Sequence, residues 1–417
     1  MDNYKFISLL IFIFLSHLTV ACSDDVSSDN KESKPIEEIK LTKHASCLFY
    51  DGSAIHINTK FDGNHDLRIS FSKCMFNELM TFSKVGLIQN QDTIASDQFD
   101  KNCSIIINEA TSDNIGPVNI NGHGWFGGNH SFQEKGALQT AQTLSYKVFA
   151  DGQSVKKGSS LYAKSIVINV INTLFDPTSV ILNNDVPTGF NNYMCTEYIN
   201  YYIQEGNIEV EARHVWNNAS PFTIMHYYGM QSMAKGDEIF FPNGNMTDFI
   251  SKRDGIQESF GKCSDFDRFI QRNAKKDWYE SALLFKENLG LHTNISTIDF
   301  VYLVSYGKVY HHLLSNKDVY KGLETKWHGI YSYIKPIVDT DLCLAYVIKT
   351  KDAYQLLIDI KKGGSTEFAL PDKIQNKEMK VIQNNQNLKA ELINQQKVRI
   401  TADKPGSIYC TFSLLSQ

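Results

Sequence analysis

The sequence predicts an all-β chain built from antiparallel sheets. Short runs rich in β-branched and aromatic residues recur along most of its length, and helix-like spacing appears only in patches. Turn pairs such as Asp51-Gly52 and Asp62-Gly63 separate the first runs. Because short turns join neighbouring strands into antiparallel pairs, we expect a large antiparallel β-sandwich with a smaller C-terminal β-module.

Strand character follows the chain in order, and the runs differ mainly in length. The runs of the first half lie at 47–50, 54–58, 67–71, 104–108, 143–149 and 161–171. Later runs lie at 300–304, 309–314, 330–338, 342–348 and 354–360, and several short ones fall between 368 and 412. We expect this last group to form the C-terminal module.

Two strands stand out by their regular alternation, at 208–216 and 222–231. In the first, Glu209, Glu211 and Arg213 line one face, and apolar residues, His214 and Trp216 line the other. Since Asn217-Asn218 is a turn signal, we expect the two strands to pair as a hairpin with one polar face.

One segment favours a helix over a strand. Ser264-Asp265-Phe266-Asp267 has the form of a capping box, in which a Ser and an acid satisfy the first backbone N–H groups. The residues from there to Lys276 are predicted to continue as a surface helix.

The N-terminus predicts an export signal. Lys5 precedes an apolar run over residues 6–21, and Cys22 follows Ala21, which indicates a signal peptide over residues 1–21. A small residue directly before Cys resembles the bacterial lipobox, which implies lipidation of Cys22. The alternative is an ordinary secretory cleavage site with a chance Cys.

The residues after Cys22 extend this interpretation. Ser23-Asp24-Asp25 resembles the acidic export signal of Bacteroidota-type surface lipoproteins, such as those of glycan-utilisation systems. This implies a lipid-anchored protein exposed on the cell outer membrane. Residues 22–40, rich in Ser, Asp, Lys and Glu, are predicted to be a flexible tether. The main sandwich is expected over residues 41–350, and the C-terminal module over 351–417.

Composition narrows the classes of partner. The formal net charge is −5 and the pI is about 6.2, so no global basic field favours nucleic acid. The eight cysteines are scattered, with no CxxC pair and no zinc-like spacing, and their pairing stays open. We expect no metal and no cofactor.

The most unusual stretch is a glycine-rich loop at residues 121–130, between two strand-like segments. It contains four glycines and four side chains suited to ligand contact, His123, Trp125, Asn129 and His130. Its other interpretation is a structural loop whose histidines hydrogen-bond to the backbone.

Three further regions combine ionisable and aromatic side chains. The first is the expected hairpin of the two alternating strands, with His226, Tyr227, Tyr228 and Gln231 in its second strand. The others are Lys308-Val309-Tyr310-His311-His312 and Lys326-Trp327-His328 with its following tyrosines. Sites commonly lie where such segments meet on a β scaffold.

Several chemistries lack their motifs. GxxxxGK[ST] and Gly-x-Ser-x-Gly are both absent, which argues against a phosphate loop and an α/β-hydrolase nucleophile. Glu209 and Glu211 would lie about 7 Å apart on one strand face, a separation that could suit a hydrolase carboxylate pair. Two alternating acids are more often a solvated face.

A mixture of His, Tyr, Asn and Arg suits β-elimination from a uronic acid. Asn, Arg or His can neutralise the carboxylate, and Tyr or His can move the C5 proton. Asn129-His130, with Tyr and His elsewhere on a β-rich chain, resembles polysaccharide lyases of the galactose-mutarotase-like supersandwich fold. The resemblance implies a lyase for a uronic-acid polysaccharide, such as the glycosaminoglycans chondroitin sulfate or hyaluronan.

We therefore predict an anionic polysaccharide as substrate. The predicted catalytic residues are Asn129, His130, Arg213, Tyr227, Tyr310 and His311, with Tyr310 as base or acid. The predicted substrate-binding residues are His123, Trp125, Gln231, Trp327 and His328. A non-catalytic glycan-binding surface lipoprotein would use the same export signal and aromatic residues. An adhesive surface protein would need neither aromatic platforms nor converging ionisable groups.

Overall fold

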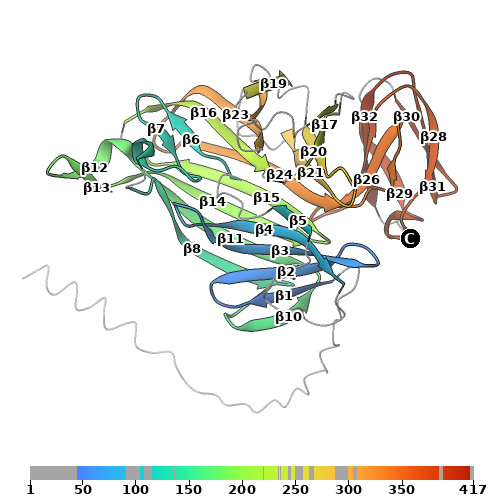
Figure 1. Ribbon diagram of the computed structural model, residues 1–417, viewed down its shortest axis with the longest axis horizontal. Coiled ribbons are helices and arrows are strands. Elements are labelled where there is room, and N and C mark those ends of the chain that lie inside the picture. The colour runs from blue at the N-terminus through green and yellow to red at the C-terminus, as the bar shows by residue number, and fades with distance from the viewer. Residues whose placement is uncertain are drawn as a thin grey trace, which may run out of the picture. The chain divides into compact units, whose positions relative to one another are not determined.

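The protein is described by a computed structural model, and β-strands account for nearly all of its regular structure (Figure 1). The helical elements of the described residues are short 3-10 turns: η2 (Phe132–Glu134), η3 (Pro177–Ser179) and η5 (Asp372–Ile374). The structure describes residues 45–90, 104–107, 115–135, 138–218, 220–232, 234, 236–242, 246–248, 257–262, 267–286, 299–303, 308–384 and 388–413. The predicted signal peptide, Cys22 and the tether lie outside these residues.

A ten-stranded antiparallel sheet forms one layer of the main sandwich. Its strands run in the order β18-β17-β20-β21-β24-β15-β14-β11-β8-β9, so segments far apart in sequence become neighbours. The strands are β8 (Ala141–Ala150), β9 (Gln153–Ser154), β11 (Ile166–Phe175), β14 (Tyr193–Gln204), β15 (Asn207–Trp216), β17 (Glu238–Phe240), β18 (Met246–Asp248), β20 (Arg268–Arg272), β21 (Tyr279–Leu284) and β24 (Glu324–Ile334).

Two six-stranded sheets lie on one face of this layer. The first has the order β10-β1-β2-β3-β4-β5 and the second β19-β22-β23-β16-β6-β7. The first contains β1 (Ser46–Tyr50), β2 (Ala54–Lys60), β3 (His65–Cys74), β4 (Leu79–Gln89), β5 (Ser104–Ile107) and β10 (Ser159–Ala163). The second contains β6 (Val118–Ile120), β7 (Gly124–Phe126), β16 (Phe222–Ser232), β19 (Gln257–Lys262), β22 (Asp299–Leu303) and β23 (Lys308–Val319).

The same face of the ten-stranded sheet packs against both smaller sheets. Tyr331 of β24 meets Phe82 of β4 at a ring-centroid distance of 4.9 Å. Four residues earlier in β24, Trp327 donates its indole N–H to the hydroxyl of Tyr227 in β16. Both contacts belong to one continuous hydrophobic core. The expectation of an all-β antiparallel sandwich is confirmed.

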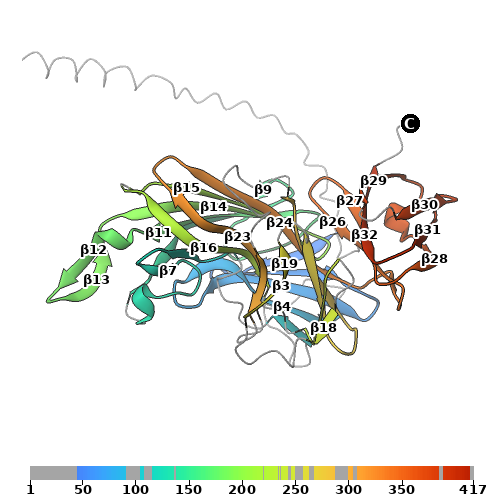
Figure 2. The ribbon, with the colours of Figure 1, turned by 90° about the horizontal axis from the view of Figure 1, so that it is seen from above.

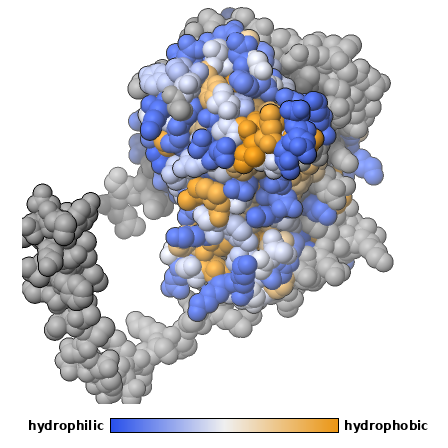
Figure 3. All heavy atoms as spheres, turned by 90° about the vertical axis from the view of Figure 1, so that its left-hand side faces the viewer, coloured by the Kyte–Doolittle hydropathy of each residue, from blue (hydrophilic) through white to orange (hydrophobic). Residues whose placement is uncertain are grey.

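A small hairpin projects from this sandwich (Figures 1 and 2). It pairs β12 (Val180–Asn183) with β13 (Val186–Phe190), and Asn184 and Asp185 form the turn in the left-handed region that a tight hairpin requires. Leu182 and Val186 expose 59% and 58% of their surface. Figure 3 looks onto this end of the molecule and shows apolar patches among polar ones.

The C-terminal module contains two further antiparallel sheets around its own core. One has the order β25-β26-β27-β32-β29 and the other β28-β31-β30. The first begins at Val338, so the boundary expected after residue 350 falls between two strands that pair with each other. The strands are β25 (Val338–Asp339), β26 (Cys343–Lys349), β27 (Tyr354–Ile360), β28 (Gly364–Ala369), β29 (Glu378–Asn384), β30 (Lys389–Ile393), β31 (Lys397–Ala402) and β32 (Gly406–Ser413).

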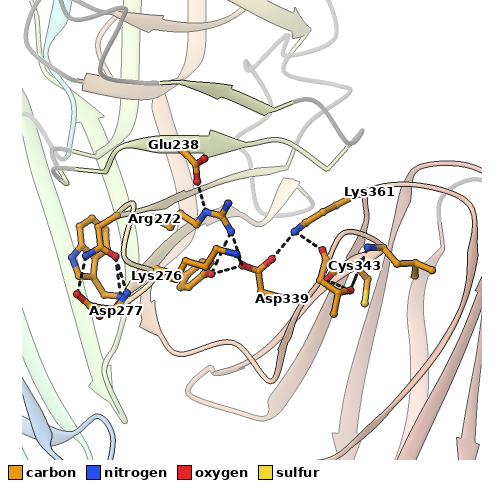
Figure 4. Close-up of polar contacts among 12 residues, drawn as sticks. Glu238, Arg272, Lys276, Asp277, Asp339, Cys343 and Lys361 are labelled. Atoms are coloured by element: carbon orange, nitrogen blue, oxygen red, sulfur yellow. Dashed lines mark hydrogen bonds and ion pairs between the residues drawn. The ribbon is translucent and has the colours of Figure 1, made fainter.

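A partly buried carboxylate links the module to the ten-stranded sheet (Figure 4). Asp339 of β25 accepts hydrogen bonds from Arg272, Tyr279 and Lys361, and Lys276 lies 3.3 Å away. Burial acts to raise the pKa of Asp339. The hydrogen bonds and positive charges outweigh it and lower that pKa to about 2. The carboxylate is therefore ionised wherever the protein is folded near neutral pH.

Two sequence predictions about local structure are wrong. β15 and β16 do not pair as a hairpin: β15 pairs with β14 and β24, and β16 pairs with β23 and β6. The expected helix is also absent, because residues 268–272 form β20, in which every side chain is buried. Burial on both faces of a strand outweighs the local capping pattern there.

Candidate functional site

The glycine-rich loop brings β7 back against the sandwich. Gly127 has φ +77°, in the region that favours glycine, and an added Cβ would stand 3.4 Å from Leu174. The turn places His130 against Trp125, and their rings stack at 5.3 Å with an interplanar angle of 20°. The loop therefore presents an indole and an imidazole as one unit.

A buried amide fixes this loop from behind. The Asn77 side chain donates to the carbonyls of Gly128 and His130 at 2.8 and 3.0 Å, and it accepts from the Thr140 N–H at 2.9 Å. Asn129 accepts the Phe76 N–H at 2.8 Å through its side-chain oxygen. Asn129, predicted to be catalytic, thus helps to anchor the loop to the β3–β4 turn.

Six side chains gather on one side of the sheet that contains β16, and we call them the histidine–aromatic face. Trp125 is the first of them, and its ring lies 6.4 Å from His226 and 5.7 Å from Tyr228. Tyr228 in turn lies 4.8 Å from Tyr310 and 4.5 Å from His312. The members are Trp125, His130, His226, Tyr228, Tyr310 and His312.

Strand pleating determines which residues reach this face. In β16, Tyr227 points into the core, so His226 and Tyr228 on either side of it point to the opposite side of the strand. In β23, Tyr310 and His312 share one side of the strand, while His311 packs against Phe269 of β20. Tyr228, Tyr310 and His312 expose only 6%, 1% and 7% of their surface, so Trp125, His130 and His226 are the accessible members of the face. The face therefore combines three segments of the chain, and more than eighty residues separate each segment from the next.

Two imidazoles meet at the centre of the face. Nδ1 of His226 lies 3.3 Å from Nε2 of His312, a hydrogen bond in which one ring donates and the other accepts. Such a pair holds at most one extra proton while the bond persists. Burial lowers the pKa of His226 below 6.5, so its ring is neutral at pH 7 and able to accept a proton.

His130 has a carboxylate partner of its own. Its Nδ1 lies 2.8 Å from Glu134 in η2, and a quarter of its side chain is exposed. The carboxylate favours a proton on Nδ1 and a fixed ring orientation. With a second proton, Nε2 would donate to an anion approaching the stack.

Two predicted catalytic residues lie on the inner side of this sheet. Tyr227 donates to the Ile115 carbonyl at 3.0 Å, and burial raises its pKa well above the usual value. His311 faces the Asp267 carbonyl at 3.3 Å, and burial lowers its pKa to about 4. Both side chains lie on the side of the strands opposite the histidine–aromatic face.

Other predicted site residues belong to the ten-stranded sheet or its core. Arg213 pairs with Glu324 at 2.9 Å and lies 4.6 Å from the Tyr198 ring. Trp327 and Gln231 are buried, with 1% and 2% of their surface exposed. His123 of the glycine-rich loop contacts Phe222, with ring centroids 6.0 Å apart.

Arg213 and His328 line a separate polar pocket of about 620 Å³. There His328 lies 2.7 Å from the carboxylate of Glu209. Glu211 pairs with Lys351 and accepts from Tyr202, and despite its burial these partners lower its pKa. A general acid needs a raised pKa, so Glu211 does not suit that role in glycoside hydrolysis.

Within the described part of the chain, no group of three or more metal-ligating side chains could hold a metal ion. Among the same residues, no helix is long and apolar enough to span a membrane.

Comparison with known proteins gives similarity of fold at most. No protein-family model matches the sequence, and no curated protein is similar to it. The solved structures it matches include the galactosidase domain of the alpha-galactosidase–sucrose kinase AgaSK, with 10% identity and a TM-score of 0.37. That match covers 69% of this chain and 42% of the other.

Two polysaccharide lyases are also similar. For heparan sulfate lyase HepC from Pedobacter heparinus, the identity is 8% and the TM-score 0.25, over 75% of this chain and 40% of the lyase. For a second polysaccharide lyase the values are 8% and 0.22, over 86% and 47%. This chain spans less than half of each of these proteins. TM-scores below 0.5 carry no argument about activity.

Three members of the histidine–aromatic face, His226, Tyr228 and His312, were not assigned a role from the sequence. Tyr310 and His312 alternate in β23, as do His226 and Tyr228 in β16, and that spacing was the available signal. It did not reveal that the two strands pair with each other.

Proposed function

We propose that this chain is a polysaccharide lyase that cleaves a uronic-acid polysaccharide by β-elimination at the histidine–aromatic face. The observation that carries the proposal is the hydrogen-bonded pair of His226 and His312 within a stack of Trp125 and two tyrosines. A neutral imidazole beside phenols supplies the proton acceptor and the proton donors that this reaction requires.

In this reaction the C5–H and C4–O4 bonds break, and a C4–C5 double bond forms. The C5 proton passes to a base, and the departing O4 takes a proton from an acid. The carboxylate at C5 must be neutralised by hydrogen bonds or positive charge, because the C5 anion is otherwise too unstable.

We assign His226 as the base, since its lowered pKa keeps it neutral and His312 can share the proton. Tyr310 is the proposed acid, with Tyr228 stacked against it. His130 is proposed to hold the carboxylate, and the Trp125 ring to stack on a sugar. Glycosaminoglycans such as chondroitin sulfate and hyaluronan are the proposed substrates.

We also propose, on the sequence alone, that the protein is a lipoprotein anchored through Cys22 at the surface of the cell outer membrane. An anchored lyase would cleave polymers that are too large to enter the cell. This location and the activity are independent proposals.

The experiment is incubation of the protein with chondroitin sulfate, hyaluronan and a neutral polysaccharide. Ultraviolet absorbance of unsaturated uronate ends should rise with the first two polymers only. If the protein binds an acidic polymer without producing unsaturated ends, it is a glycan-binding lipoprotein instead. If it neither binds nor cleaves, the histidine–aromatic face is not a glycan site.

A further inference from the structure

Three lysines converge on one tyrosine ring at the edge of the C-terminal module. The ammonium groups of Lys349, Lys373 and Lys377 lie 5.1, 5.2 and 4.7 Å from the centroid of Tyr354. They come from the end of β26, from η5 and from the residue before β29, so tertiary packing brings them together. We call these three residues the lysine cluster.

The cluster contains more positive than negative charge. Among the described residues, its one ion pair joins Lys373 to Glu205 at 3.2 Å. Lys349 and Lys377 have no carboxylate within ion-pair distance in that part of the chain. The hydroxyl of Tyr354 donates to the same Glu205, so this carboxylate is already shared.

The environment of Lys349 is mixed in charge. Burial lowers the pKa of Lys349, while Glu205, Asp352 and Glu209 act to raise it and the charge of Lys377 adds a smaller lowering effect. Contact with an aromatic face contributes only about 0.5–1 kcal/mol at a partly exposed site. An anion placed between the three ammonium groups would add favourable charge interactions at a partly exposed site.

The cluster adjoins a space large enough for such an anion. Glu205 and Lys373 belong to the wall of a pocket of about 770 Å³, which Lys60 and Lys335 also line. These last two are paired with Asp66 and Asp62 at 3.1 and 3.3 Å. Lys373 is the member of the lysine cluster that borders this pocket, whose wall also contains Asp62 and Asp372, while Lys349 and Lys377 lie outside its lining.

We propose that the lysine cluster is a second anion-binding site, which takes a sulfate or carboxylate group of an acidic polysaccharide. The cluster lies on different strands from the histidine–aromatic face, and no residue is shared between them. If the proposed lyase activity is correct, this site would hold an acidic polymer at a second point and raise its affinity by multivalency.

The test uses dextran sulfate, which contains no uronic acid and cannot undergo the elimination. Its binding to the full chain is compared for the wild type, a Lys349→Gln/Lys377→Gln variant, and a Lys380→Gln/Lys397→Gln control. The control removes the same charge from two exposed lysines. Sodium sulfate at matched ionic strength distinguishes a free oxyanion from a polymer as the ligand.

We expect the cluster variant to bind dextran sulfate about tenfold more weakly than wild type, with a smaller dependence on salt, and the control to bind as wild type. The melting temperature of the cluster variant without ligand should stay close to that of wild type, so that weaker binding does not reflect unfolding. Equal binding by all three proteins, or equal losses in both variants, would overturn the proposal. Loss in the cluster variant from a chain without lyase activity would support the site and reject only the activity.

Discussion

At the scale of single residues, the pair of His226 and His312 is the feature most directly tied to chemistry. If His226 accepts the C5 proton, His226→Gln should reduce kcat about 100-fold or more while polymer binding stays nearly intact. Tyr310→Phe should cause a similar loss, because it removes only the hydroxyl. Initial rates of unsaturated product formation would measure both.

The matched controls are His65→Gln and Tyr320→Phe, which change an exposed histidine and an exposed tyrosine on other parts of the surface. For wild type, activity should fall as the pH decreases through the lowered pKa of His226, below 6.5, because the protonated ring cannot act as a base. Full activity of His226→Gln would place the base elsewhere.

A second residue-scale prediction concerns Glu280, which lies buried in β21. Burial raises its pKa to about 7, although a hydrogen bond from Ser232 acts to lower it. As the pH rises, the unfolded chain loses the Glu280 proton near pH 4.5, whereas the folded protein keeps it to about pH 7. Stability should therefore decrease between these two pH values. Above that range the free energy of unfolding should be lower by about 3 kcal/mol than at acidic pH.

Glu280→Gln keeps the size of the side chain and removes the charge. We expect this variant to be more stable than wild type at pH 8 and nearly equal to it at pH 4, as measured by denaturant unfolding. The exposed Glu378→Gln should show no such difference. If the stability of Glu280→Gln depended on pH as that of wild type does, the pKa of Glu280 would not be raised in the folded protein.

At the scale of structural elements, the glycine-rich loop depends on Asn77 for its position. Asn77→Ala would leave buried carbonyls of the loop and the Thr140 N–H without their partner. We expect a loss of about 2–4 kcal/mol in unfolding free energy. Product formation should fall as well, since Trp125 and His130 would lose their fixed stack.

Thermal unfolding and product formation measured on the same samples would check both effects. Replacement of the exposed Asn64 by Ala should leave both unchanged. If Asn77→Ala were as stable and as active as wild type, the loop would be held by its glycines and by Asn129 alone.

At the scale of the whole molecule, the remaining prediction concerns location. Cys22→Ala should prevent lipidation, and the variant should appear in the soluble fraction of the producing cell instead of the membrane fraction. A single acyl chain binds membranes only weakly, so stable anchoring requires the several chains that lipoprotein cysteines carry. Cell fractionation with surface labelling would measure this. Unchanged membrane retention would exclude Cys22 as the anchor.

The sequence by itself determined the all-β class and the alternation within individual strands. In β15, Ile208, Val210 and Ala212 face the core as predicted, and Glu209 lies on the opposite face. These features depend on neighbours two residues apart, so a local pattern contains them. The short strands of the C-terminal module are likewise local patterns.

Only the tertiary structure decided which strands pair and which side chains share a site. β15 and β16 follow each other in sequence but lie in different sheets, which separates Arg213 from Tyr228. Conversely, the histidine–aromatic face joins Trp125, His226 and His312 across three strands. The physical reason is that strand pairing depends on hydrogen bonds and core burial between distant segments, and the local period of a strand does not specify its partner.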